Sequence, residues 1–260
     1  PFVVISGAIL LLIFAGALLA PLSPYDPEMM DLAAKSRQPS WAHLFGTDEF
    51  GRDYFTRALY GGRVSLAVGV MSMLPALLLG SVYGAVSGYR GGWLDALMMR
   101  IVDILFSLPG FLLIIIFRTM APAGLWPLVL IIGFFSWMPV ARIARAETMS
   151  IKGRDFILAA KGLGGGGPRI MFNHIIPNAS ASILVAASLS VANAILMESA
   201  LSFFGFGIKP PLASWGNMLQ SAQGLILYQP YLAVFPGLLI LLTVMSFNIL
   251  GDAAREALSG

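Results

Sequence analysis

The chain has 260 residues, of which 58% are hydrophobic and only 11% are Asp, Glu, Lys or Arg. Soluble domains carry roughly 25% charged residues, and a water-facing surface cannot be built from so few charges, so a soluble globular domain is excluded. The net charge of +3 is too small to indicate nucleic-acid binding. The absence of Cys excludes disulfides, thiolate zinc sites and cysteine nucleophiles, and the two His residues are too few for a histidine-rich metal site.

Six apolar segments are candidates to span a membrane. A bilayer core about 30 Å thick needs roughly 20 apolar residues of helix. Five runs of this size occupy residues 2–22, 64–88, 119–141, 175–197 and 231–250. The sixth, residues 98–117, carries Arg100 and Asp103 near one end, where an Arg reaches the interface and an Asp suits the helix dipole. We therefore predict an all-α polytopic membrane protein with six transmembrane helices.

The first apolar run follows directly on Pro1, so we expect a further N-terminal segment to precede it. Residues 2–22 contain an Ala20-Pro21 junction that suits a cleaved signal peptide, but the run exceeds the ~7 to 15 residues of a signal-peptide core, so we expect a retained helix. The chain then divides into residues 1–63, the first transmembrane helix with an external segment, and residues 64–260, a membrane core with a loop at about 142–174.

The loop at residues 142–174 sets the expected orientation. It holds six of the 16 basic residues (Arg142, Arg145, Lys152, Arg154, Lys161 and Arg169) against Glu147 and Asp155. Because cytoplasmic loops carry an excess of Lys and Arg, we expect this loop to be cytoplasmic. Six spans then place both termini in the cytoplasm and residues 23–63 outside.

Small residues form stripes on two of the predicted spans. In the second span they recur at every fourth position, as Ser72, Ala76, Gly80, Gly84 and Gly88, and we expect this stripe to pack within the chain. In the fifth span the same spacing gives Ser182, Ala186, Ser190 and Ala194. For this second stripe, packing, a subunit interface and a substrate path remain open.

The segments expected on the outer side carry several polar candidates. Ser214 is placed to cap a short helix, with Trp215 as an interfacial anchor. The cluster of His43, Asp48, Glu49 and Asp53 suits a divalent cation, although solvated charges or local ion pairs are the preferred interpretation. Glu198 and Arg118 indicate either a polar pathway or side chains that reach the interface from helix ends.

No pattern in the sequence indicates an enzyme. Residues 162–167 give the G-x-x-x-x-G half of a phosphate loop, but Pro168-Arg169 follows where Lys and Ser or Thr are needed. The glycines are better interpreted as a turn between two helices. No nucleophile, base and orienting group occur at a catalytic spacing.

The loop at 142–174 is too long for a simple turn, and its pattern predicts a short helix, a glycine turn and a second short helix. Phe156, Ala160 and Leu163 share one helical face, and Pro168 suits the first turn of the next helix. Such a projection is suited to a groove on a cytoplasmic partner.

This loop resembles the signature of permease subunits of binding-protein-dependent ABC importers, which is E-A-A, three residues, Gly, nine residues and I-x-L-P. Leu158-Ala159-Ala160, Gly164 and Ile176-Pro177 stand at that spacing. Leu158 replaces the acidic residue and His174 the first Ile of the signature. Gly164 also fits a turn that needs a positive φ.

Further segments resemble the peptide/nickel branch of that family, and in particular the second of its two paired subunits, the C-type permease of oligopeptide and dipeptide systems. They are residues 46–53 (GTDEFGRD), 88–95 (GYRGGWLD), 99–103 (MRIVD), 174–178 (HIIPN), 201–207 (LSFFGFG) and 247–252 (FNILGD). The resemblance runs from about residue 21 to the end.

The resemblance implies a bacterial inner-membrane complex of this chain, a homologous permease, two ATPase subunits and an external binding protein. ATP and Mg would be bound by the ATPase subunits, with no cofactor, metal or catalytic residue in this chain. The candidate coupling residues are Phe156, Leu158, Ala159, Ala160, Lys161, Gly164 and Arg169. The candidate path or permease-interface residues are Ser182, Ala186, Ser190 and Ala194.

Alternatives remain at this point. A nickel or glutathione importer is not separable from a peptide importer by the membrane helices. A secondary transporter or channel would require buried charged relays or inverted broken-helix repeats, and neither is evident. A membrane anchor for a cytoplasmic enzyme would explain the projecting loop but not the outer segment.

Overall fold

The computed structural model describes residues 1–259, and these residues form helices and connecting loops, with one isolated antiparallel bridge between Thr47 and Asp53. The longer helices are α1 (Phe2–Leu19), α2 (Tyr54–Arg90), α3 (Gly92–Ser107), α4 (Gly110–Met120), α5 (Leu125–Phe135), α6 (Trp137–Ile151), α9 (Ile176–Phe203) and α11 (Tyr231–Ser259). Shorter ones are α7 (Asp155–Gly162), α8 (Gly167–Ile170) and α10 (Trp215–Ala222), and one π-helical turn, Met171–Ile175, joins α8 to α9. The predicted all-α class is confirmed.

Five helical segments are long and apolar enough to cross a membrane: Phe2–Leu22, Tyr54–Arg90, Leu125–Ile151, Gly167–Phe203 and Tyr231–Leu258. The pair α3 and α4, bent by 83°, makes a sixth only when it is counted as one broken span. The bend falls at Leu108 and Pro109, because proline excludes the preceding residue from the helical conformation.

The predicted span 119–141 has the wrong boundaries. α4 ends at Met120, and Pro122 and Gly124 interrupt the chain before α5 begins. Gly124 has a φ of +136°, a conformation that only glycine adopts readily. The membrane segment then continues through α6 to Ile151, ten residues beyond the predicted end, because Pro139 lies in the first turn of α6, where proline is tolerated.

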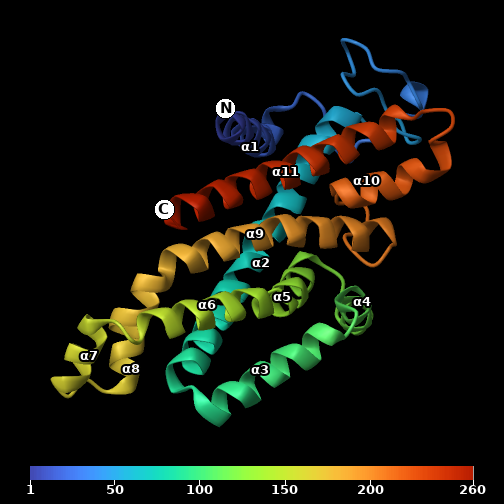
Figure 1. The fold of residues 1–260 in the computed structure, drawn as a ribbon. Helices are drawn as coiled ribbons and strands as arrows, with labels where there is room; N and C mark the ends of the chain where they lie inside the picture. Colours follow the sequence, from blue (N-terminus) through green and yellow to red (C-terminus); the bar gives the residue numbers. More distant parts are fainter. Residues whose placement is uncertain (260) are drawn as a thin grey trace.

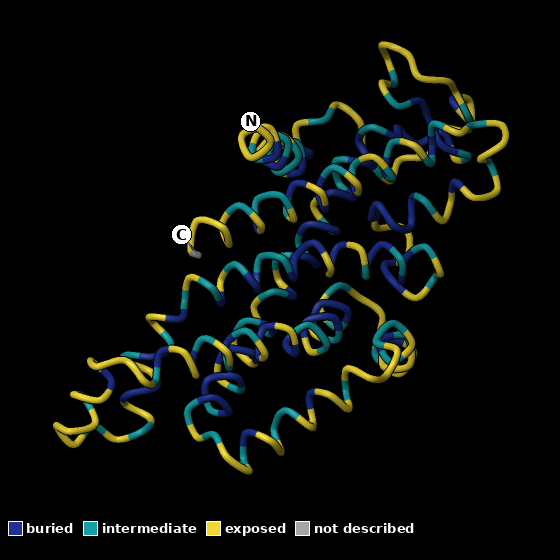
Figure 2. Tube along the Cα trace, in the orientation of Figure 1, coloured by how far each residue is buried: buried dark blue, intermediate teal, exposed yellow. Residues whose placement is uncertain are grey.

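Helix α2 lies at the centre of the bundle and packs against α6, α9 and α5, with α1 and α11 on another side (Figure 1). Its glycine stripe allows close approach to α6, because a Cβ on Gly80 would lie 2.6 Å from the Cβ of Val140, and one on Gly88 would lie 2.7 Å from the Arg145 carbonyl oxygen. The expectation that this stripe packs within the chain is confirmed. Buried residues follow α2 and α9, whereas α1 and the α7–α8 projection are largely exposed (Figure 2).

The short helix α10 is capped as predicted. Ser214 accepts a hydrogen bond from the backbone N–H of Asn217, and the Asn217 side chain accepts one from the backbone N–H of Ser214. Trp215 is not an interfacial anchor, because it is only 1% exposed, and its indole N–H donates to the Ala58 carbonyl at 2.9 Å. Its ring lies against Gly61 and Gly62 of α2, so this Trp fixes α10 to the bundle.

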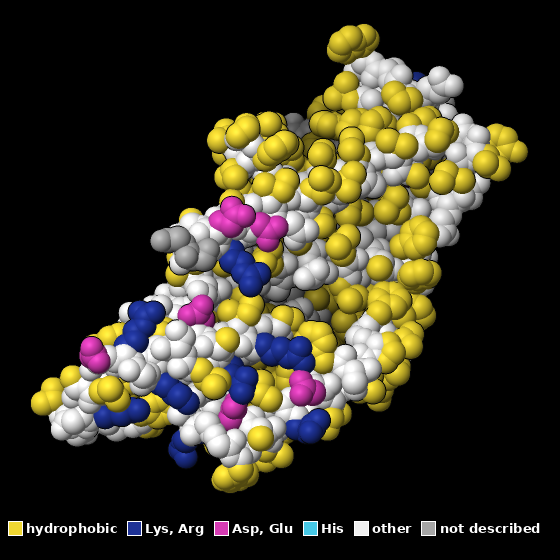
Figure 3. Space-filling model, viewed as in Figure 1, with side chains coloured by type: hydrophobic (Ala, Val, Ile, Leu, Met, Phe, Trp, Pro, Cys, Tyr) yellow, Lys and Arg dark blue, Asp and Glu magenta, His cyan; other side chains and the backbone are white. Residues whose placement is uncertain are grey.

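Charged side chains are unevenly distributed over the surface. On the face shown in Figure 3, Lys, Arg, Asp and Glu gather at the end that carries α6, α7 and α8, and the flanks of the bundle are mainly hydrophobic. We call the end with α7 and α8 the projecting end, and the end with residues 23–53 and α10 the opposite end. Exposed apolar flanks beside a charged end fit a protein surrounded by lipid.

Candidate functional site

The projecting end is a helix–turn–helix. α7 begins at Asp155, which favours the positive end of the helix dipole. The backbone N–H of Gly164 donates to Lys161, and that of Gly165 donates to Ala160. Gly164 has a φ of +81°, as expected for a turn glycine, and a Cβ at this position would meet nothing within 4 Å. The turn therefore needs glycine for its backbone conformation and not for lack of space.

The projecting end exposes large apolar side chains to its surroundings. Leu163 at the turn is 89% exposed, Leu158 is 53% exposed and Phe156 is 41% exposed. Of the other candidate coupling residues, Ala159, Lys161, Gly164 and Arg169 are exposed and Ala160 is half-buried. Large apolar side chains exposed on a charged projection are typical of a surface that another protein covers.

A compact cluster attaches this projection to the membrane helices. Ile157, which the sequence analysis did not single out, is fully buried with Ile170 and Ile175 against α2 and α6. The Lys161 ammonium lies 5.4 Å from the ring centroid of Tyr89, near the end of α2. The projection and the core helices are therefore packed as one unit.

A polar network lies where α2, α3 and α6 meet beside this cluster. Asp95 accepts hydrogen bonds from Nε and Nη2 of Arg145 at 2.5 and 2.6 Å, and one from Ser87 Oγ at 2.5 Å. Lys152 Nζ donates to the Gly88 carbonyl at 2.8 Å. The sequence analysis missed Asp95 and Arg145 as partners, because they are 50 residues apart and neither residue occupies a motif that indicates pairing.

A cavity of about 560 Å³ opens between the α3–α4 pair, α5–α6 and α9. Its lining is mainly apolar, with Ser136, Ser190 and Asn193 as polar members. Of the stripe Ser182, Ala186, Ser190 and Ala194, only Ser190 reaches this cavity. Ala186 is 9% exposed, Ala194 is 1% exposed and packs in the cluster with Val68 and Leu128, and Ser182 is half-buried.

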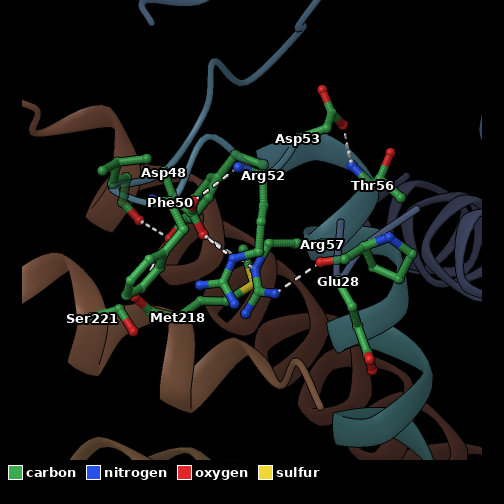
Figure 4. A network of polar contacts seen from close by, with 12 residues as sticks. Glu28, Asp48, Phe50, Arg52, Asp53, Thr56, Arg57, Met218 and Ser221 are labelled. Atoms are coloured by element: carbon green, nitrogen blue, oxygen red, sulfur yellow. Dashed lines mark hydrogen bonds and ion pairs between the residues drawn. The ribbon is translucent and has the colours of Figure 1, made fainter. Parts of the chain in front are cut away.

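At the opposite end, Asp48 organises the segment of residues 23–53 (Figure 4). Its carboxylate accepts a hydrogen bond from Arg52 Nε at 2.7 Å and lies 3.6 Å from Arg57 Nε. It also accepts the backbone N–H groups of Phe50 and Arg52. All three charged side chains are at least nine-tenths buried.

His43 and Asp53 form a second pair, with 2.9 Å between Nδ1 and Oδ2. The ion-pair interpretation of the polar cluster is therefore confirmed for Asp48, and Asp53 is hydrogen-bonded to His43. Among residues 1–259, no group of three or more His, Asp or Glu side chains is arranged to hold a metal ion.

Glu198 and Arg118 do not reach the interface from helix ends, because they are 0% and 6% exposed. Glu198 accepts a hydrogen bond from Ser65 at 2.8 Å, which joins α9 to α2, and one from Ser202 of its own helix at 2.6 Å. Arg118 donates to the Phe206 and Pro122 carbonyls at 3.0 and 2.7 Å. Both side chains therefore belong to the interior of the protein.

Comparisons with known proteins agree with this architecture. Residues 76–259 match the family described as binding-protein-dependent transport system inner membrane component. The oligopeptide transport system permease protein OppC of Bacillus subtilis is 40% identical over 251 residues, which cover 96% of this chain and 82% of that protein. The dipeptide transport system permease protein DppC of the same organism is 41% identical, covering 96% and 79% of the two chains.

A third relative is the glutathione transport system permease protein GsiD of Pectobacterium atrosepticum, which is 40% identical over 98% of this chain and 85% of its own length. The family match includes the cavity, the network at Asp95 and Arg145, and the projecting helix–turn–helix. This chain is therefore a multi-pass membrane protein that belongs to the family of binding-protein-dependent transport system inner membrane components.

Proposed function

We propose that this chain is one of two paired permease subunits of an ATP-driven importer of dipeptides or oligopeptides, located in a bacterial inner membrane. The relatives named for oligopeptide and dipeptide transport support this substrate class. The observation that carries the proposal is the exposure of three large apolar side chains, Phe156, Leu158 and Leu163, on a projection whose buried Ile157 and Ile170 belong to one cluster with residues of α2 and α6. Two ATPase subunits, a homologous permease and an external binding protein complete the proposed complex.

The distribution of charge supports a cytoplasmic projecting end. Residues 142–169 and the end of α2 hold seven basic residues, whereas the external segment 23–63 has five basic and six acidic residues. A positive excess near membrane-helix ends favours the cytoplasmic side. Both termini then lie in the cytoplasm when α3 and α4 cross the membrane together.

The proposed mechanism is mechanical. The ATPase partners bind ATP and Mg, and their closure displaces the docked projection. Because Ile157, Ile170 and Ile175 join the projection to α2 and α6, its movement is transmitted to the helices that line the cavity. The pathway helices have two arrangements, and these differ in their affinity for the closed ATPase pair. This difference in affinity is the condition for a population shift.

The complex reconstituted in lipid vesicles tests the substrate class. ATP-dependent accumulation of dipeptides, longer peptides, glutathione and Ni²⁺ is measured in the presence of the binding protein. We expect accumulation of di- or oligopeptides. Accumulation of Ni²⁺ alone, or uptake without ATP, would contradict the proposal, as would ATP hydrolysis by the purified chain alone.

The docking role has a separate test. Leu163→Asp introduces a charge at the most exposed apolar side chain of the projection, and we expect weaker capture of the ATPase subunits and lower uptake. Leu227→Asp is the matched control, because Leu227 is also 89% exposed but lies at the opposite end. Deletion of residues 159–167 is expected to abolish coupling while the chain still inserts into the membrane. Unchanged ATPase capture and unchanged uptake in Leu163→Asp and in the deletion variant would overturn the docking role.

A further inference from the structure

Arg118, near the end of α4, is a buried cation without a counter-ion among the described residues. Its guanidinium is solvated by three backbone carbonyl groups, those of Phe206, Pro122 and Gly207, at 3.0, 2.7 and 3.4 Å. No carboxylate of residues 1–259 forms an ion pair with it. An unpaired buried charge is costly, and an ionisable side chain within a membrane segment marks a functional site by default.

The Arg118 side chain faces a pocket of about 330 Å³ between the α4–α5 connection and the segment that follows α9. Lys209 lines the same pocket, is exposed and forms no hydrogen bond or ion pair among the described side chains. The remaining lining residues are Thr119, Ala121, Ala123, Gly205 and Phe206, none of which is acidic. Two cations with no acidic residue beside them create a field that attracts a carboxylate or another anion.

This cationic pocket follows the apolar cavity along two helices. On α4, Phe111 and Ile114 line the cavity and Arg118 lines the pocket, at the spacing of one helical face. On the other side, Ala200 of α9 lines the cavity and Gly205, just beyond α9, lines the pocket. The ring of Phe111, which lines the cavity, lies 5.8 Å from the ring of Phe204, the neighbour in sequence of the pocket residue Gly205.

We propose that Arg118 and Lys209 bind the C-terminal carboxylate of the transported peptide while its side chains occupy the adjoining apolar cavity. This inference rests on the proposed function and adds a binding site to it. A peptide combines one carboxylate terminus with apolar side chains, and the pocket and the cavity offer these two environments in sequence. Arg118 is fixed by backbone carbonyl groups and so is preorganised, whereas Lys209 is free to approach the ligand.

The charge of the pocket is tested by thiol labelling. The chain has no Cys, so Ala123→Cys places a single thiol of this chain at the pocket wall. The intact importer in vesicles of zwitterionic lipid is treated with an anionic and a cationic methanethiosulfonate. We expect the anionic reagent to be favoured about tenfold relative to the same ratio at Ala42→Cys, an exposed site of the outer segment. Lys209→Met should remove most of this preference.

The occupant is tested in the same preparation, with the complex stalled by a non-hydrolysable ATP analogue and supplied with the binding protein. We expect a dipeptide with a free carboxylate to slow labelling of Ala123→Cys and its C-terminal amide to have no such effect. Equal protection by the peptide-free binding protein would assign the pocket to protein docking and overturn the inference. Protection that appears only when anionic lipid is added would assign it to a lipid headgroup, with the same consequence.

Transport separates this inference from the proposed function. With the binding protein saturating, we expect Lys209→Met to lower the uptake rate of the free-acid dipeptide about fivefold relative to its amide, and Arg118→Lys to lower it further. Lys35→Met is the matched control, because Lys35 is an exposed cation at the same end and lies outside the pocket. If wild-type uptake is normal but neither Lys209→Met nor Arg118→Lys changes the ratio of free-acid to amide uptake, Arg118 and Lys209 do not bind the carboxylate. If the wild-type complex accumulates no peptide, the proposed function itself fails.

Discussion

Asp95 on α3 and Arg145 on α6 form a bidentate ion pair, with Nε to Oδ1 at 2.5 Å and Nη2 to Oδ2 at 2.6 Å. Asp95 is 8% exposed and also accepts a hydrogen bond from Ser87 of α2, so one carboxylate connects three helices at the projecting end. Around α3, Asp103 also pairs with Arg142 of α6, and Tyr83 of α2 donates to the Met98 carbonyl. The Asp95–Arg145 ion pair therefore helps to hold α3 against α6.

The first prediction concerns this pair. Asp95→Asn should lower the free energy of unfolding by about 1–3 kcal/mol, because a charged hydrogen-bond partner of a half-buried Arg is lost. A double-mutant cycle with Arg145→Gln, measured by denaturant titration in detergent micelles, gives the coupling energy. Asp103 and Arg142 provide the control, since their 2.7 Å pair also joins α3 to α6 but is about half exposed. We expect a coupling energy of less than about 1 kcal/mol for the Asp103–Arg142 pair. Equal coupling energies for the two pairs would contradict the role of Asp95 and Arg145 in holding α3.

The second prediction concerns the glycine stripe of α2. Gly84→Ala should lower the free energy of unfolding by about 1–3 kcal/mol, because its Cβ would lie 2.7 Å from the Cβ of Ala144 and force α6 away. Gly7→Ala in α1 is the control, since a Cβ there meets nothing within 4 Å. The control should be neutral or stabilising by about 0.5 kcal/mol, because Ala is the better helix former. The same change at both positions would show that the stripe does not set the α2–α6 distance.

Much of the fold follows from the sequence because it depends on local and periodic signals. The apolar runs predict most of the spans, the four-residue period predicts the contact face of α2, and Ser214 predicts the start of α10. The signals are strong because every lipid-facing backbone group has to be satisfied within a helix.

Other features depend on which distant residue lies opposite, and the sequence does not specify that. Trp215 is of a residue type common at membrane interfaces, but Gly61 and Gly62 leave space for its ring inside the bundle. Ile157 is no more apolar than Phe156, yet Ile157 is buried in the cluster with residues of α2 and α6 and Phe156 is exposed. The bend of 83° between α3 and α4 could be located at Pro109 from the sequence, whereas its size depends on packing.

The third prediction concerns the turn of the projection. Gly164→Val should destabilise the turn locally by about 1–2 kcal/mol, because a β-branched residue is strained at a φ of +81°. Hydrogen–deuterium exchange of the amides of Gly164 and Gly165, which donate to Lys161 and Ala160, should quicken about tenfold. Gly166→Val is the control, since Gly166 has a φ of −67° and open space for a Cβ. The exchange rate in Gly164→Asn should lie between those in Gly164→Val and Gly166→Val. Faster exchange in Gly166→Val alone would contradict this account.

The fourth prediction concerns the segment of residues 23–53. Asp48→Ala leaves Arg52 and Arg57 buried without their shared carboxylate, and also removes the acceptor of two backbone N–H groups. We expect a local destabilisation of about 3–5 kcal/mol. The loop between Ala34 and Thr47, which Asp48 helps to hold against the bundle, should then open more often. Trypsin cleavage after Lys35 and Arg37 should be faster by about tenfold or more, because cleavage follows the population of the open form.

Glu49→Ala is the matched control for Asp48→Ala, because Glu49 is the neighbouring carboxylate and makes no ion pair among residues 1–259. Its cleavage rate should equal that of the wild type. A second variant, Arg57→Met, removes the hydrogen bond of 2.9 Å to the Pro27 carbonyl while Asp48 keeps Arg52. It should give an intermediate rate, since one cation of the network remains paired. If Asp48→Ala and Glu49→Ala were cleaved at the same rate, the buried carboxylate would not be what holds this segment in place.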